Sequence, residues 1–176
     1  MDILATKLPG VLIVQVKAHI DERGLFARIF DAAAFAQAGM PTAWPQCNTS
    51  WNKQRGTMRG MHFQMAPRPD AKLVRCTRGR IFDVAVDLRP NSGTFRQWVG
   101  VELSHDNRTA FFVPAGCVHG FLTLEDDCEV FYMMGEVYAP ELASGVRWND
   151  PAFNIEWPFT PTTMAEKDAS WPDFRP

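Results

Sequence analysis

The sequence lacks the features that mark membrane-spanning, nucleic-acid-binding or disulfide-rich proteins. It contains no apolar run near the roughly 18 residues that a membrane-spanning helix needs. Its net charge is only −2, from 18 basic and 20 acidic residues, so no overall field attracts nucleic acid or an anionic membrane. The four cysteines are scattered and form no C-x2-C pair. We therefore expect a cytoplasmic protein whose cysteines are reduced packing residues, with neither nucleic acid nor a membrane as partner.

Long helical patterns are scarce as well, and short strand patterns take their place. Residues 80–89 alternate, which puts Phe82, Val84 and Val86 on an apolar face and Asp83 and Asp87 on the opposite face. Strands recurring every 8 to 12 residues between turn-rich segments indicate an all-β sandwich or barrel. The other strands are predicted at 11–17, 25–30, 97–104, 109–114, 120–124 and 129–138. The chain length suits one domain, residues 1–176.

Two short helices are predicted outside these strands. One covers residues 31–39, with Asp31 as N-cap and Gly39 closing the helix in the left-handed conformation. The other lies near the C-terminus, where Thr163 and Glu166 have the spacing of a capping box. We expect both helices to be peripheral to the β-structure.

Residues 56–79, GTMRGMHFQMAPRPDAKLVRCTRG, follow the spacing of a metal-binding motif with two changes of consequence. The motif G-x5-H-x-H-x3-4-E-x6-G belongs to the cupins, a family of small barrels, and the chain resembles it. His62 is kept, Gln64 stands at the second ligand position, and Lys72 replaces the glutamate. The second cupin motif survives as Pro114, Gly116 and His119. The resemblance implies a jelly-roll barrel.

The lysine decides what this motif can do. An ammonium has no lone pair to offer a metal, so we predict that the metal site is lost and that no cofactor is needed. A fixed positive charge beside a neutral histidine can stabilise an enolate while the histidine removes the neighbouring proton. Residues His62 and Lys72 therefore predict proton abstraction next to a carbonyl.

Further motifs along nearly the whole chain resemble one cupin family, the dTDP-4-dehydrorhamnose 3,5-epimerases of deoxysugar and polysaccharide biosynthesis, including the O-antigen. They are DERGLF (21–26), QCNTS (46–50), RGMHFQ (59–64), AKLVR (71–75), DVAVDLR (83–89), SGTF (92–95), VPAGCVHGF (113–121), Tyr132, YAPE (138–141), RWNDP (147–151), IEWP (155–158) and KD (167–168). The resemblance implies a metal-independent epimerase acting on a nucleotide-linked 4-keto-6-deoxy sugar.

The resemblance also implies the catalytic roles. His62 would be the general base, paired with Asp168, Tyr132 the acid on the opposite face of the sugar, and Lys72 the support of the enolate. Inverting a carbon beside a ketone requires a base on one face and an acid on the other. Ordinary acidities of about 6.5 for histidine and about 10 for tyrosine suit these roles at neutral pH.

The substrate-binding residues and the assembly are implied in the same way. Arg59 and His119 would line the sugar pocket, and Phe26 and Tyr138 would sandwich the base of the nucleotide. Arg23, Gln46 and Asn48 would contact the nucleotide and its phosphates, and Arg28 and Lys167 complete the predicted substrate-binding set. The resemblance implies a homodimer that exchanges N-terminal arms.

Two departures from the family pattern bear on the nucleotide. Arg28 stands where an acidic residue near the thymine is usual, and Ala143 stands where glutamate is usual. Arginine has donors but no acceptor, so it mismatches the N–H donor of a thymine edge and suits cytosine, guanine or a phosphate better. We therefore expect that dTDP is not preferred over CDP or GDP.

Several alternatives remain open at this point. Epimerisation at carbon 3, at carbon 5 or at both needs the same base and acid. A metal-dependent cupin using His62 and His119, a non-catalytic sugar-nucleotide-binding module and a ketoisomerase on the same barrel are the competing hypotheses. His19 and His105 have no partner set and are expected to be structural.

Overall fold

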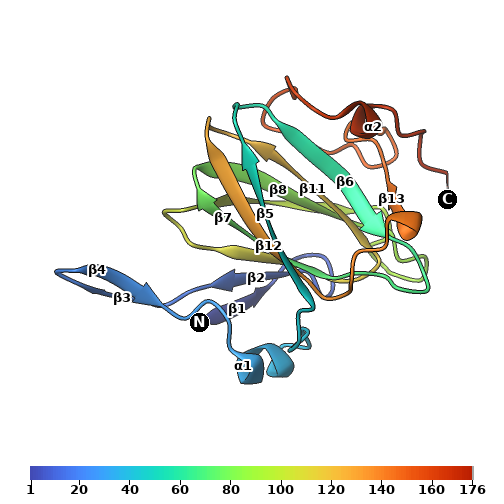
Figure 1. Ribbon diagram of the computed structural model, residues 1–176. Helices are drawn as coiled ribbons and strands as arrows, with labels where there is room; N and C mark the ends of the chain where they lie inside the picture. Colours follow the sequence, from blue (N-terminus) through green and yellow to red (C-terminus); the bar gives the residue numbers. More distant parts are fainter. Residues whose placement is uncertain (176) are drawn as a thin grey trace.

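The computed structural model describes residues 1–175 and consists mainly of two facing β-sheets (Figure 1). The six-stranded sheet has the order β1 (Asp2–Ala5), β2 (Leu12–Gln15), β10 (Ala110–Val113), β7 (Lys72–Arg78), β12 (Cys128–Met134), β5 (Gln46–Asn52). The five-stranded sheet has the order β13 (Ala143–Gly145), β6 (Met58–Gln64), β11 (Cys117–Thr123), β8 (Arg80–Asp87), β9 (Trp98–Ser104). This arrangement is the predicted all-β jelly-roll barrel.

The hydrophobic core fills one end of the space between the two sheets. Val74, Ile81, Phe111 and Val130 are all fully buried there and come from both sheets. Burying side chains of this size stabilises the fold by about 1.5–3 kcal/mol each. The other end of the barrel is therefore left to hold a cavity.

Strand β8 is buried on both faces, which the alternating pattern did not predict. Val84 and Val86 pack on the outside against Phe153 of the C-terminal segment. Asp83 and Asp87, on the opposite face, are also fully buried. Each carboxylate therefore needs hydrogen-bond partners inside the protein.

Asp87 finds these partners in the turn that follows its own strand. Its oxygens accept hydrogen bonds from Arg89 Nε (2.8 Å), Ser92 Oγ (2.5 Å) and Thr94 Oγ1 (2.7 Å). Burial alone would raise the pKa of Asp87, but these donors outweigh it and hold the pKa well below the usual range. Because Arg89 also donates to the Pro9 carbonyl at 2.8 Å, the network ties the N-terminal segment to the barrel.

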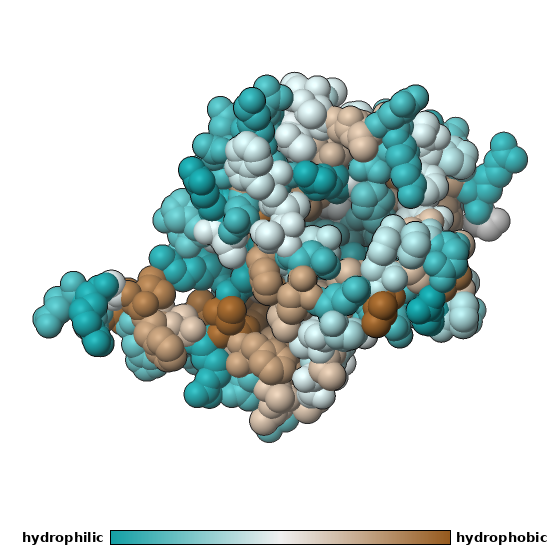
Figure 2. All heavy atoms as spheres, viewed as in Figure 1, coloured by the Kyte–Doolittle hydropathy of each residue, from teal (hydrophilic) through white to brown (hydrophobic). Residues whose placement is uncertain are grey.

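A β-hairpin of β3 (Ala18–Asp21) and β4 (Gly24–Ala27) projects from the barrel as an arm (Figure 1). Strand β4 overlaps the strand predicted for 25–30 but ends at Ala27, and β3 lies outside the predicted strands. Ile20 is 80% exposed and Phe26 is 72% exposed. Figure 2 shows hydrophobic residues gathered on the arm and where it joins the barrel.

Helix α1 (Ala32–Gln37) forms as predicted, since Asp31 accepts hydrogen bonds from the Ala33 and Ala34 N–H groups. Gly39 has the expected positive φ of 71°. The backbone after β12 also forms a short 3-10 helix, η1 (Pro140–Leu142).

The predicted capping box of the second helix is wrong. Helix α2 (Glu166–Ala169) has Ala165 as N-cap with no side-chain hydrogen bond. Thr163 instead forms a β-bridge with Thr57, and its carbonyl accepts the Met58 N–H at 2.8 Å, so it continues an extended segment. No helix within residues 1–175 is long and apolar enough to cross a membrane.

The four cysteines are free thiols, as predicted. Cys76, Cys117 and Cys128 are buried, and burial raises the pKa of Cys117 to about 12. Cys47 is exposed, because it points outward from the edge strand β5, so its prediction as a packing residue is wrong.

Candidate active site

A cavity of about 530 Å³ lies between the two sheets, and strand register determines which residues face it. On the six-stranded sheet Tyr132 of β12 lies opposite Asn48 of β5 and Val74 of β7. The next inward-facing row pairs Met134 with Gln46 and with Lys72. All six side chains line the cavity.

The opposite wall is formed by β6 and β11, where His62 and His119 are register partners. Gly60 of β6 has a φ of 134°, and a Cβ atom there would lie 2.5 Å from the Cα of Gly120. Only glycine allows this close approach, which brings the two histidines side by side on the cavity wall.

His62 is paired with a carboxylate from the C-terminal helix. Its Nε2 lies 2.7 Å from Asp168 Oδ1, and Asp168 Oδ2 accepts the Gly60 N–H at 3.2 Å. Burial raises the pKa of Asp168, but the two hydrogen bonds and the charges of His62 and Lys167 lower the pKa by more than burial raises it. The carboxyl group is therefore ionised at neutral pH. A carboxylate only accepts, so Nε2 carries the proton and Nδ1 keeps a free lone pair.

His119 has a carboxylate partner of a different kind. Its Nε2 lies 2.6 Å from Asp83 Oδ1, while Asp83 Oδ2 is buried and has no hydrogen-bond partner within residues 1–175. Burial raises the pKa of Asp83, only partly offset by His119. The side chain of His119 is 10% exposed, against 45% for His62. Both histidines line the cavity, and His62 is the more exposed one and the one whose carboxylate partner has a lowered pKa.

Lys72 reaches the cavity from the first position of β7. Its Nζ lies 2.5 Å from Asp70 Oδ2. The Lys72 side chain is 14% exposed and that of Asp70 only 2%. Both residues line the cavity, and Lys72 is the more exposed partner of this ion pair.

Tyr132 stands on the wall opposite His62, in the other sheet. Burial raises its pKa, Arg59 lowers it, and Asp70 and Tyr138 raise it further, with a net shift upward. The hydroxyl therefore stays protonated through the neutral range and is suited to donate a proton.

The lining side chains do not form a metal centre. No group of three or more His, Cys, Asp or Glu side chains converges within the described chain. The Nε2 atoms of both cavity histidines are already engaged by carboxylates, and the Lys72 ammonium has no lone pair for a metal.

Comparison with known proteins assigns the family. A family model described as dTDP-4-dehydrorhamnose 3,5-epimerase matches residues 5–176. An epimerase of that name from Methanothermobacter thermautotrophicus is 45% identical over 175 residues, covering 98% of this chain and 94% of the relative. The chain belongs to the dTDP-4-dehydrorhamnose 3,5-epimerase family. It is a carbohydrate epimerase, an enzyme of the isomerase class.

Solved structures of the epimerase family agree closely with this barrel. The Bacillus anthracis epimerase with TDP and PPi bound has a TM-score of 0.95 at 36% identity, covering 98% of this chain and 99% of that one. The Legionella pneumophila enzyme in complex with dTDP-4-keto-L-rhamnose has a TM-score of 0.91 at 36% identity, covering 97% and 90%.

The epimerase cavity brings together ten of the thirteen residues predicted to act on the substrate. They are His62, Lys72, Tyr132 and Asp168 of the predicted catalytic set, and Gln46, Asn48, Arg59, His119, Tyr138 and Lys167 of the predicted binding set. Two of them are partly committed within the protein. Gln46 Oε1 accepts the Tyr138 N–H at 2.6 Å, and Arg59 Nε donates to Asn52 at 2.6 Å.

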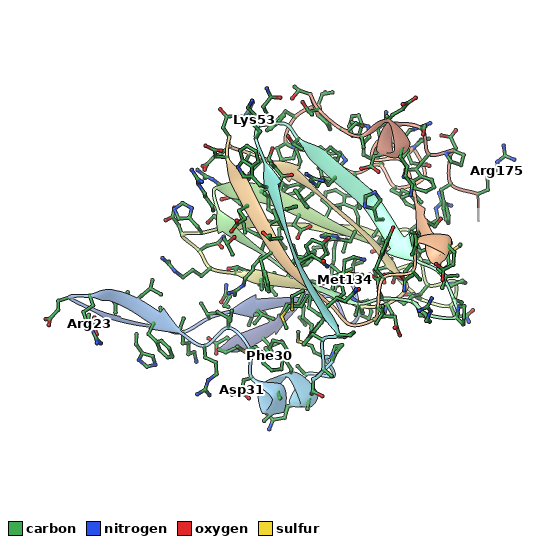
Figure 3. The ribbon with its side chains drawn as sticks, viewed as in Figure 1. Arg23, Phe30, Asp31, Lys53, Met134 and Arg175 are labelled. Carbon is green, nitrogen blue, oxygen red and sulfur yellow. The ribbon has the colours of Figure 1, made fainter. Side chains whose placement is uncertain are left out.

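The three predicted arm residues do not line this cavity. Figure 3 shows Arg23 at the tip of the hairpin, where its Nη2 lies 2.6 Å from Asp21. Phe26 is largely exposed, and Arg28 donates to Asp31, the N-cap of α1, at 2.9 Å. Within one chain these residues therefore form a separate surface.

Sequence reasoning passed over Asp70, the buried partner of Lys72. Its only signal was a carboxylate two residues before a lysine that follows a proline-rich turn. Gln64, noted only as a vacant ligand position, accepts the Ala139 N–H at 2.8 Å and donates to the Arg68 and Val137 carbonyls at 2.6 and 3.2 Å. It joins two loops at the cavity rim.

Proposed function

We propose that this epimerase inverts carbon 3, carbon 5 or both in a dTDP-linked 4-keto-6-deoxy sugar, in the biosynthesis of activated deoxysugars for polysaccharides. One observation carries the proposal: His62 and Tyr132 enter one cavity from opposite sheets. A base and an acid placed on two walls can reach the two faces of a sugar ring lying between them. Residues 1–176 would act as one domain.

In the proposed reaction His62 Nδ1 removes the proton from the carbon next to the 4-keto group. The C–H electron pair moves into the ring, and an enolate forms with its charge on oxygen 4. The Lys72 ammonium stabilises that oxygen, and Asp168 stabilises the imidazolium through its 2.7 Å hydrogen bond. Tyr132 then donates its proton to the opposite face of the carbon, which inverts it and restores the ketone.

Support for dTDP as the nucleotide comes from the relatives and from Arg28. The Bacillus anthracis relative has TDP bound, and the Legionella pneumophila relative is in complex with a dTDP sugar. Arg28, the basis for expecting another nucleotide, is paired with Asp31 of its own chain. Calorimetry with dTDP, CDP and GDP tests the choice, and tighter binding of CDP or GDP would reject it.

We also propose that the arm completes the cavity of a second copy in a homodimer. The arm carries exposed apolar side chains, and its three predicted substrate contacts are absent from the cavity of their own chain. The outer strand β5 has one unpaired edge in the chain as described, a feature that sheets usually cover.

Deuterium incorporation in heavy water tests the catalytic proposal. The 4-keto-6-deoxyglucose derivatives of dTDP, CDP and GDP are incubated with the protein, and the carbon that gains deuterium is read by NMR. His62→Ala should abolish exchange, whereas His105→Ala, a substitution of an exposed histidine outside the cavity, should leave it unchanged. Tight binding without exchange on any substrate would instead favour a binding module, and product analysis separates a ketoisomerase.

A mixing experiment tests the exchanged arm. A His62→Ala chain with an intact arm is refolded together with a Phe26→Ala, Arg23→Ala chain that has an intact cavity. If the arm serves the neighbouring copy, the mixed dimer regains one complete site and activity rises above that of either variant alone. If the mixture stays as inactive as its parts, the arm does not act in the partner's site.

A further inference from the structure

Asp70 is a buried carboxylate in the segment between β6 and β7. Its Oδ2 accepts a hydrogen bond from Lys72 Nζ at 2.5 Å, and its Oδ1 accepts the Gln64 backbone N–H at 3.1 Å. With only 2% of its side chain exposed, Asp70 is held on one side by the ammonium and on the other by strand β6. The proposed reaction assigns it no step.

The segment that carries Asp70 is fixed independently of Lys72. The Gln64 side-chain amide donates to the Arg68 carbonyl at 2.6 Å, within the same segment. The same amide holds the loop on the other side of the rim through Val137 and Ala139. Asp70 is therefore a fixed hydrogen-bond acceptor, to which the flexible Lys72 side chain donates.

A fixed acceptor matters because of the chemistry of lysine. The ammonium is a point charge on a four-carbon stem with many rotamers, and it carries three donors. When one N–H points at Asp70, the position of Nζ is set and two donors are left for the cavity. Preorganised donors stabilise developing charge better than donors that must reorient during the reaction.

We infer that Asp70 is a positioning residue, which fixes the Lys72 ammonium where the enolate oxygen forms. The inference rests on the proposed function, because it assumes that Lys72 supports the enolate. It predicts that Asp70 acts on the rate only through Lys72, and that its effect falls on kcat more than on KM.

A double-mutant cycle tests this dependence. Asp70→Asn keeps the volume of the side chain and an oxygen that can still accept the Gln64 N–H, but it removes the charge that holds Lys72. We expect Asp70→Asn to lower kcat for deuterium exchange about 10- to 100-fold, with KM within about threefold of wild type. In a Lys72→Met background the same change should alter kcat less than about twofold.

Asp70→Glu supplies the second variant, because it restores a carboxylate that the long lysine stem can follow. It should recover part of the rate lost in Asp70→Asn. This comparison can be made even where the Lys72→Met variant is too slow for the double-mutant cycle. Thermal unfolding of each variant confirms that it is folded at the assay temperature. A residue that only shapes the turn would give no such recovery.

The experiments distinguish a failure of the proposed function from a failure of the positioning role of Asp70. Absence of exchange in the wild-type protein would remove the proposed function itself. If wild type exchanges, an equal loss from Asp70→Asn with and without Lys72 would overturn the positioning role. So would a full rate in Asp70→Asn, a full rate in Lys72→Met, a loss confined to KM, or an Asp70→Glu variant no faster than Asp70→Asn.

Discussion

Replacing Asp168 by asparagine is predicted to harm the reaction more than replacing it by alanine. The Gly60 N–H points at Oδ2 of Asp168 and accepts nothing, so the amide oxygen of Asp168→Asn should face Gly60. The amide NH2 then faces His62 Nε2 at the position now 2.7 Å away. Because that group donates, the proton of the imidazole is forced onto Nδ1 and the base loses its lone pair.

The two substitutions therefore remove different amounts of catalysis. A positioned general base contributes about 10²- to 10⁴-fold, so the wrong tautomer in Asp168→Asn should lower kcat by about that factor. Asp168→Ala leaves both tautomers accessible and removes only the hydrogen bond to the imidazolium. Such a bond to a charged group is worth about 1.5–3 kcal/mol, or a rate loss of roughly 10- to 100-fold.

The assay is deuterium exchange under saturating substrate at neutral pH, with thermal unfolding as a check on the fold. Asp173→Asn is the matched control, because Asp173 is a carboxylate of the same C-terminal segment that pairs with Arg147 and does not line the cavity. It should exchange at the wild-type rate. An Asp168→Asn variant as fast as Asp168→Ala, or faster, would refute the tautomer argument.

Three further outcomes are expected. Tyr132→Phe should keep deuterium exchange but lose inversion, with the His105→Ala control keeping both; loss of exchange and inversion together would contradict the role of Tyr132 as acid. Asp87→Asn should lower the free energy of unfolding by about 3 kcal/mol at pH 7, because it breaks a buried charge pair with Arg89. Since the folded pKa of Asp87 is depressed, this difference is full above the unfolded value of about 3.9 and shrinks as pH falls below it, as urea unfolding across pH will check. Treatment with a chelator should leave exchange unchanged, and a rate that falls and returns with added zinc or iron would restore the metal-dependent alternative.

The sequence predicted the barrel and most of the cavity because both depend on local patterns. Tyr132 was expected from the resemblance to the epimerase family, and the histidine and lysine positions follow from motif spacing. The strand pattern did not predict that Asp83 is buried, because the apolar face of β8 packs outward under a second layer of C-terminal residues and the face of Asp83 is turned to the inside of the barrel. Which strand faces receive such a layer depends on contacts between residues far apart in the chain.

One local signal was misleading, and one residue of the cavity gave almost no signal. Thr163 and Glu166 have the spacing of a capping box, but the bridge to Thr57 keeps the backbone extended until Ala165, so pairing with a distant segment overrides the cap. Asp70 gave almost no signal, because its proposed role depends on the 2.5 Å contact with Lys72 that the turn before β7 creates. Turn geometry of this kind is not encoded in a pattern of residue types.

The two histidines of the cavity illustrate how burial divides equivalent motifs into different roles. His62 and His119 are register partners, and each has a carboxylate within hydrogen-bond distance. When a histidine acts as a base it becomes an imidazolium, and an ionised carboxylate beside it stabilises that charged form. Burial raises the pKa of Asp83, and one of its oxygens has no partner within residues 1–175. This buried carboxyl group therefore gives less support to a positive charge on His119. Asp168 has a lowered pKa and a backbone donor, and this difference favours His62 over His119 as the proposed base.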